Sequence, residues 1–146
     1  MSASRLAELV QRRVVMLDGG FGSMLIAAGL EPGRAPDWWK LERPDAVAAV
    51  HRAYVEAGSD VIHANTFGST PAKLAAVGLA GRCREVNAAA VVLARSACAP
   101  GTLVPGDIGP TGLLLPPVGG GTVAEMRASF AEQAAALAAA GVDLLS

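Results

Sequence analysis

Short apolar runs recur along the chain, and each is rich in β-branched or aliphatic residues. They cover residues 14–17, 61–64, 103–108 and 142–145, and Pro105 and Gly106 interrupt the third run. Runs of this length and composition are typical of strands that are buried on both faces of a sheet. We therefore predict one buried strand for each run.

Helical periodicity fills the segments between these runs. The clearest case has the spacing i, i+3, i+4, i+7 and i+8 of one helical face, at Val47, Val50, His51, Tyr54 and Val55. Pro44 favours the start of this helix, and Gly58 favours its end. Similar spacing predicts a helix over residues 82–99, preceded by a shorter helix around residues 72–77.

The helix before the last run is marked at both ends. Thr122 and Glu125 match a capping box, in which each side chain pairs with a backbone N–H, and Gly141 ends the helix. Strand and helix thus alternate, which indicates an α/β fold with a parallel sheet, either doubly wound or closed into a barrel. Because Ser146 follows the last run with no helix to cover it, we expect residues 1–146 to belong to a larger domain.

The composition is that of an ordinary globular protein, with 52% hydrophobic residues and a net charge of -1. The 12 basic residues do not exceed the 13 acidic ones, and no apolar stretch approaches ~20 residues. We therefore expect a cytoplasmic protein that binds neither nucleic acid nor a membrane. Cys83 and Cys98 lie in one predicted helix, where they fit neither a disulfide framework nor a metal clip, and we interpret both as small buried residues.

Polar residues follow the first three predicted strands, and a glycine comes soon after each of them. These residues are Asp18, Asn65 with Thr66, and Asp107. Parallel α/β folds bind ligands at the carboxyl ends of their strands, so we expect these side chains on one rim. An aspartate can bind the ammonium of an amino acid, and the N–H groups of a glycine turn before a helix favour its carboxylate. Taken singly, each of these residues fits an ordinary turn or cap equally well.

The two histidines and the glycine motifs give no further indication of a functional site. His51 lies on the predicted helix face and His63 lies inside a predicted strand, so we interpret both as structural residues. The chain has no G-x-G-x-x-G motif after its first strand and no G-x-x-x-x-G-K-[ST] motif, so the usual signatures of a nucleotide site are absent.

A series of motifs carries a family resemblance. The motifs are VVMLDGGFGS at 14–23, RPDAV at 43–47, HRAY at 51–54, AGSD at 57–60, NTFG at 65–68 and GDIGPTG at 106–112. In this order and spacing they closely resemble the homocysteine S-methyltransferase family, which includes the homocysteine-binding modules of cobalamin-dependent methionine synthases. The resemblance runs from about Val14 to Ser146 and implies a (β/α)₈ TIM-type barrel, truncated to about its first four strands.

The resemblance implies methyl transfer to the sulfur of homocysteine, which gives methionine. In that family a zinc ion held by three cysteine thiolates binds the substrate sulfur as a thiolate, and a small-molecule or cobalamin-bound methyl donor, such as methylcobalamin, alkylates it. The resemblance also implies that Asp18 receives the substrate ammonium and that the N–H groups of Gly19, Gly20 and Phe21 receive its carboxylate. The remaining residues expected to line or support this pocket are Asn65, Thr66 and Asp107.

The chain departs from the family in its cysteines. The family's zinc ligands lie on later strands, and Cys83 and Cys98 match none of them. We therefore expect residues 1–146 to be the N-terminal part of the homocysteine-binding domain, with the amino-acid rim but without the zinc ligands, and to be inactive alone. Two alternatives stay open: a phosphate-binding or aldolase-like barrel enzyme, and a non-catalytic half-barrel that associates with another copy.

Overall fold

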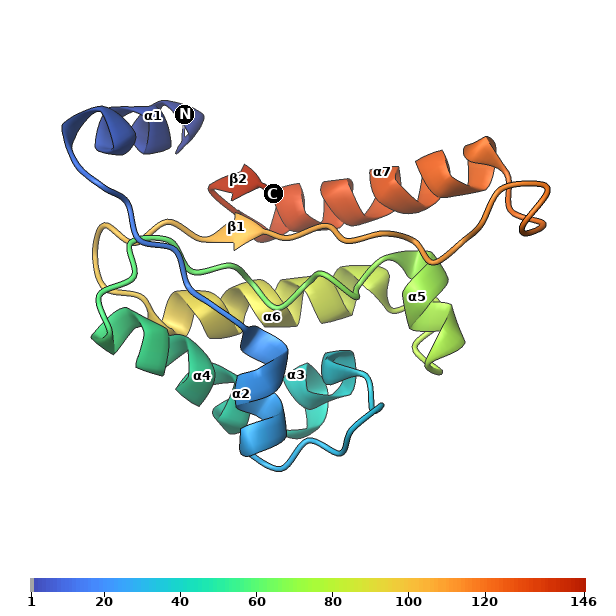
Figure 1. Cartoon of the computed structure of the whole chain (residues 1–146), viewed down its shortest axis with the longest axis horizontal. Helices are drawn as coiled ribbons and strands as arrows, with labels where there is room; N and C mark the ends of the chain where they lie inside the picture. The colour runs from blue at the N-terminus through green and yellow to red at the C-terminus, as the bar shows by residue number, and fades with distance from the viewer. Residues whose placement is uncertain (1) are drawn as a thin grey trace.

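The computed structural model describes residues 2–146, in which helices dominate (Figure 1). The first elements along the chain are α1 (Ser2–Arg12), α2 (Phe21–Ala27), the 3₁₀ helix η1 (Pro36–Trp38) and α3 (Trp39–Glu42). The remaining elements are α4 (Pro44–Glu56), α5 (Pro71–Ala76), α6 (Cys83–Ala97), β1 (Pro105–Gly106), α7 (Val123–Ala140) and β2 (Leu144–Leu145).

Extended segments lie side by side in chain order, and all are parallel. Single bridges join Leu17 to Val61 and Val61 to Leu103, while β1 pairs with β2 in the register Pro105 to Leu144. The predicted runs are therefore neighbours in one parallel sheet, although only β1 and β2 form regular strands. The backbone hydrogen bonds between the third and fourth segments are interrupted at two positions. The N–H of Val104 donates to the side chain of Asp143, at Oδ2 and 2.7 Å, and Pro105 has no N–H to donate.

The three longest helices, α4, α6 and α7, form one layer against this sheet. Helix α6 packs against both α4 and α7, so neighbours in the chain are also neighbours in space. Between this layer and the sheet lies the main core cluster, which consists of Ile62, Ala64, Ala90, Val91, Ala94, Val104 and Leu137. The sheet approaches α7 closely at Gly106, where a Cβ atom would lie 2.8 Å from Leu137 Cδ1. Gly106 is therefore needed for packing.

Local signals predicted the helix ends well. Helix α4 begins at Pro44 as expected and ends at Glu56, close to Gly58 with φ +98°. The capping box of α7 is present, and Gly141 closes that helix with φ +82°. Helices α5 and α6 are also confirmed within one or two residues of the predicted bounds. Helices α1, α2 and α3 were not predicted.

Two surfaces of the chain are strongly apolar. The first extended segment exposes 80% of Val14 and 56% of Met16, and α7 exposes 68% of Val123 on the face opposite the core. Within residues 2–146, no helix combines the length and the apolar character that crossing a membrane would require.

Candidate amino-acid site

The carboxyl ends of the extended segments surround a small cavity of about 260 Å³. Its walls are formed by Asp18, Gly19, Phe21, His63, Ala64, Asn65, Thr66, Phe67, Asp107 and Ser146. The structure thus brings together all of the predicted site residues except Gly20. It adds His63, which the sequence analysis had interpreted as structural only.

Asp18 and His63 form a close polar pair in this cavity. His63 Nδ1 lies 2.7 Å from Asp18 Oδ1, and the backbone N–H of His63 donates to Asp18 Oδ2 at 2.9 Å. The Asp18 side chain is only 4% exposed, whereas that of His63 is 23% exposed. The hydrogen bond to Asp18 raises the pKa of His63, because it stabilises the imidazolium form. Asp18 therefore orients the ring of His63.

Asp107 is the second carboxylate of the cavity. Its backbone is held by Thr66, whose Oγ1 donates to the carbonyl of Asp107 at 2.7 Å and accepts from its N–H at 2.9 Å. Burial raises the pKa of Asp107; the nearby His63 lowers it, and Asp18 raises it. Thr66 is wholly buried, so its hydroxyl serves the backbone of Asp107.

The glycine turn lies between this cavity and α4. The hydroxyl of Tyr54 donates to the carbonyl of Gly20 at 3.3 Å, and a Cβ atom on Gly19 would lie 3.1 Å from the same hydroxyl oxygen. Gly20 thus directs its carbonyl toward α4 and α2, which explains why it does not line the cavity. Among residues 2–146, the N–H groups of Gly19, Gly20 and Phe21 donate no hydrogen bond, so they are available to an anion.

Two buried amides hold the loop that carries Asn65 and Thr66. Gln133 Nε2, from α7, donates to the carbonyl of Thr66 at 2.7 Å, and Asn87 Nδ2, from α6, donates to the carbonyl of Ser69 at 3.0 Å. Gln133 Nε2 also donates to Asn87 Oδ1 at 3.2 Å. Both amides are wholly buried, so the helix layer fixes the second wall of the cavity.

A buried ion pair stabilises the other side of this loop. Lys40 Nζ, from α3, lies 2.7 Å from Asp37 Oδ1 and donates to Ser69 Oγ at 2.6 Å. Ser69 Oγ in turn donates to Asp37. Burial lowers the pKa of Lys40, and Asp37 opposes that shift. This closed cluster fixes η1 and α3 against the loop.

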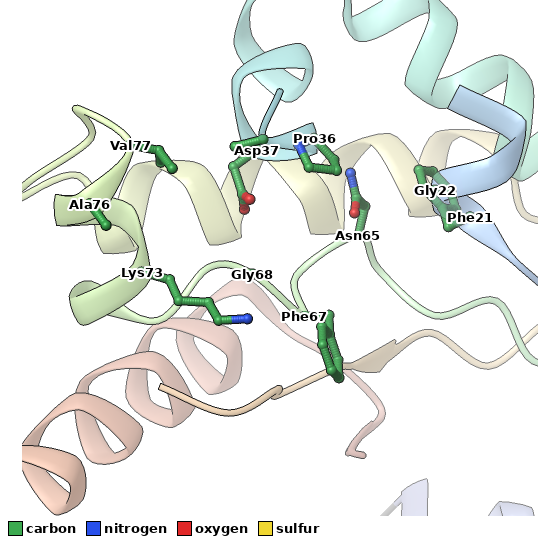
Figure 2. A pocket seen from close by; sticks show the side chains of 11 residues that line it. Phe21, Gly22, Pro36, Asp37, Asn65, Phe67, Gly68, Lys73, Ala76 and Val77 are labelled. Atoms are coloured by element: carbon green, nitrogen blue, oxygen red, sulfur yellow. The ribbon is translucent and has the colours of Figure 1, made fainter. Parts of the chain in front are cut away.

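A larger cavity of about 520 Å³ adjoins the first and shares Phe21, Asn65 and Phe67 with it. In Figure 2, Asp37 and Lys73 approach it from η1 and α5, and the end of the Lys73 side chain is directed toward Phe67. Lys73 Nζ lies 5.3 Å from the centre of the Phe67 ring, within the range of a cation–π contact. Within the described residues, the buried Nδ2 of Asn65 has no hydrogen-bond partner.

Among the described residues, the other titratable groups do not gather into a metal site. His51 is wholly buried against Phe21, with ring centres 4.7 Å apart, and burial lowers its pKa to about 4. Cys83 and Cys98 lie at the two ends of α6, about 22 Å apart along the helix axis. Across residues 2–146, no three His, Cys, Asp or Glu side chains gather as metal ligands would.

Comparison with known proteins decides the family. The model of the homocysteine S-methyltransferase family matches residues 15–146. The chain belongs to this family. It is 31% identical to the methionine synthase of Mycobacterium tuberculosis (strain ATCC 25618 / H37Rv) over 155 residues, which cover 96% of the chain and 13% of that relative. The methionine synthase of Mycobacterium leprae (strain TN) is also 31% identical, with 94% and 12% covered.

Solved structures agree with the sequence relatives. The metallated form of the homocysteine methyltransferase MmuM from Escherichia coli superposes with a TM-score of 0.79 at 28% identity. That superposition covers 97% of this chain and 56% of MmuM. The apo form of MmuM gives a TM-score of 0.73 at 25% identity. The chain therefore spans about half the length of MmuM and a much smaller share of the methionine synthases.

Proposed function

We propose that this chain forms the amino-acid-binding part of an enzyme that transfers a methyl group to the sulfur of homocysteine and so makes methionine. The observation that carries the proposal is the cavity, in which two carboxylates, Asp18 and Asp107, lie beside Gly19 and Phe21, whose N–H groups donate no hydrogen bond within residues 2–146. The carboxylates attract the ammonium of a zwitterion, and the N–H groups attract its carboxylate. Family membership and the names of the relatives support homocysteine as this amino acid.

We also propose that the parallel sheet is part of a (β/α)₈ barrel. Three features support the barrel: neighbouring strands follow chain order, their helices form one layer, and the polar residues gather at the carboxyl ends of the strands. The two carboxylates argue against the phosphate-binding alternative, because they would repel a phosphate group at this rim.

The sulfur must become a thiolate before it can accept a methyl group. A free thiol has a pKa of ~8.5, and zinc bound to such a sulfur removes its proton. Cys83 and Cys98 do not fit a zinc site, because they lie at opposite ends of α6 and burial raises the pKa of Cys83 to about 11. The residues of this chain are therefore assigned to binding and orienting the amino-acid part of the substrate.

A binding titration tests this function directly. L-Homocysteine is added under reducing conditions to the ¹⁵N-labelled chain, and amide shifts are followed by NMR. We expect the largest shifts at residues 19–21 and at Asp107. The variant Asp107→Asn should bind more weakly, while Asp45→Asn, the same change at an exposed aspartate of α4, should bind as the unaltered chain does. Absence of saturable shifts in the unaltered chain would refute the proposal.

A further inference from the structure

His63 lies in the wall of the small cavity with one ring nitrogen anchored and the other free. Nδ1 and the backbone N–H both contact Asp18, at 2.7 and 2.9 Å. Within residues 2–146, Nε2 has no hydrogen-bond partner, and it is not among the buried atoms that lack one. Because the hydrogen-bonding directions of the two ring nitrogens diverge widely, Nε2 points away from Asp18 and is open to a ligand.

The charges around the ring define what Nε2 can bind. Asp18 on the first segment and Asp107 on the third are the charged groups that act on His63. From α4, His51 lies near Asp18 but is buried, with its pKa lowered to about 4, so it is neutral at pH 7. No lysine or arginine lines the cavity. His63 is thus the one side chain of these walls that can present a positive charge to a ligand.

A zwitterionic amino acid needs such a charge. Two carboxylates alone would favour a simple amine over an amino acid, because the substrate carboxylate would be repelled. A protonated imidazole held by Asp18 corrects this imbalance, and its orientation is already set before the ligand arrives.

We propose that His63 is a specificity-determining residue that donates a hydrogen bond from Nε2 to the α-carboxylate of the bound amino acid, with Asp18 as its positioning residue. The inference rests on the proposed amino-acid site. It adds a charged contact to the backbone N–H groups of Gly19 and Phe21, and it leaves the ammonium to the two aspartates. His63 therefore lets the site distinguish an amino acid from a thiol amine that has no carboxylate.

The first test measures the pKa of His63 by NMR titration of its ring, with two probes. L-Homocysteine should raise this pKa by about one unit, because its carboxylate stabilises the imidazolium. The probe 3-aminopropane-1-thiol keeps the ammonium and the thiol but has no carboxylate, so it should leave the pKa unchanged or lower it. A homocysteine complex in which the pKa of His63 stays constant or falls would overturn the inference.

The second test uses variants and compares the two probes. His63→Gln keeps a side-chain hydrogen-bond donor but cannot carry charge, and it should raise the Kd for homocysteine about tenfold. The Kd for 3-aminopropane-1-thiol should not rise. Asp18→Asn should lower the pKa of His63 in the free chain, which shows the positioning role even if His63→Gln folds poorly. An equal loss of affinity for both probes would overturn the role in specificity.

These outcomes separate the inference from the proposed function. If the unaltered chain binds homocysteine but His63 does not respond to the carboxylate, only the inference is wrong. If the unaltered chain does not bind homocysteine at all, the proposed function and the inference both fail.

Discussion

Two buried or partly buried pairs of this chain, each between an aspartate and a basic side chain, have the same short distance and different expected roles. Lys40 and Asp37 lie 2.7 Å apart, as do His63 and Asp18. The Lys40 side chain is wholly buried, and Ser69 completes its cluster by contacting both partners. The His63 side chain keeps 23% of its surface exposed and leaves one nitrogen free. Accessibility, and not the distance between the partners, therefore separates a structural pair from a candidate binding group.

The largest loss of stability is expected when the buried cluster of Lys40, Asp37 and Ser69 is broken. Lys40→Met leaves Asp37 buried without its cation, so the free energy of unfolding should fall by about 3–5 kcal/mol. Urea denaturation measures this loss. The Lys73→Met variant serves as a control, because Lys73 is only half-buried and makes a cation–π contact with Phe67, so the substitution should cost less than about 1 kcal/mol. A Lys40→Met chain as stable as the unaltered one would contradict the structural role.

The contributions of His51 and His63 to the free energy of unfolding should change with pH in opposite directions. Burial lowers the pKa of His51 to about 4, so the folded chain loses stability as the pH falls below the unfolded value of ~6.5. Between pH 6.5 and 4 this loss amounts to about 3 kcal/mol. The raised pKa of His63 acts the other way, because its stabilisation is complete below ~6.5 and is lost as the pH rises through the folded value.

Thermal unfolding at several pH values measures both effects. His51→Phe should remove most of the loss on the acid side, and His63→Gln should remove the decline on the neutral side. Acid sensitivity that persists unchanged in His51→Phe would show that another group is responsible.

An intermediate effect on stability is expected from Gln133, the buried amide that holds the loop at the rim of the cavity. Gln133→Leu leaves the buried carbonyl of Thr66 without its donor, which should lower the free energy of unfolding by about 1–3 kcal/mol. Hydrogen exchange of the Ser69 amide, which donates to the same carbonyl of Thr66 at 2.9 Å, should become faster, because the loop loses its contact with α7. The exposed Gln11→Leu variant is the matched control. Unchanged exchange in Gln133→Leu would mean that Gln133 does not hold the loop.

The smallest effect on stability is expected in the open cavity. Asp107→Asn keeps the backbone contacts to Thr66 and should change the free energy of unfolding by less than about 1 kcal/mol. Its effect should instead be on binding, with the Kd for homocysteine raised about tenfold or more by loss of a charge-assisted hydrogen bond. Calorimetry and urea denaturation of the same preparation give both values. A large loss of stability with unchanged affinity would place Asp107 with the structural pairs.

Features that depend on neighbouring residues in the chain were accessible from the sequence. Pro44, Thr122 with Glu125, and Gly141 act on the backbone within a few residues, so the ends of α4 and α7 were predicted correctly. The alternation of apolar runs and helices was sufficient for a parallel sheet, because such connections require a crossover. The polar residues after the strands were expected on one rim for the same reason, and their roles stay predictions.

Only the tertiary structure decided which of these polar groups meet, and how. Asp18 reaches His63 across 45 positions, and Lys40 reaches Ser69 across 29, through the register of parallel strands and the packing of η1 and α3. Gly20 belongs to the predicted turn, yet its carbonyl faces Tyr54, away from the cavity. Sequence periodicity identifies which face of an element is buried, but a contact between two side chains depends on register and helix orientation. Those are determined by the packing of the whole chain, which is why His63 looked structural from the sequence and faces the cavity in the fold.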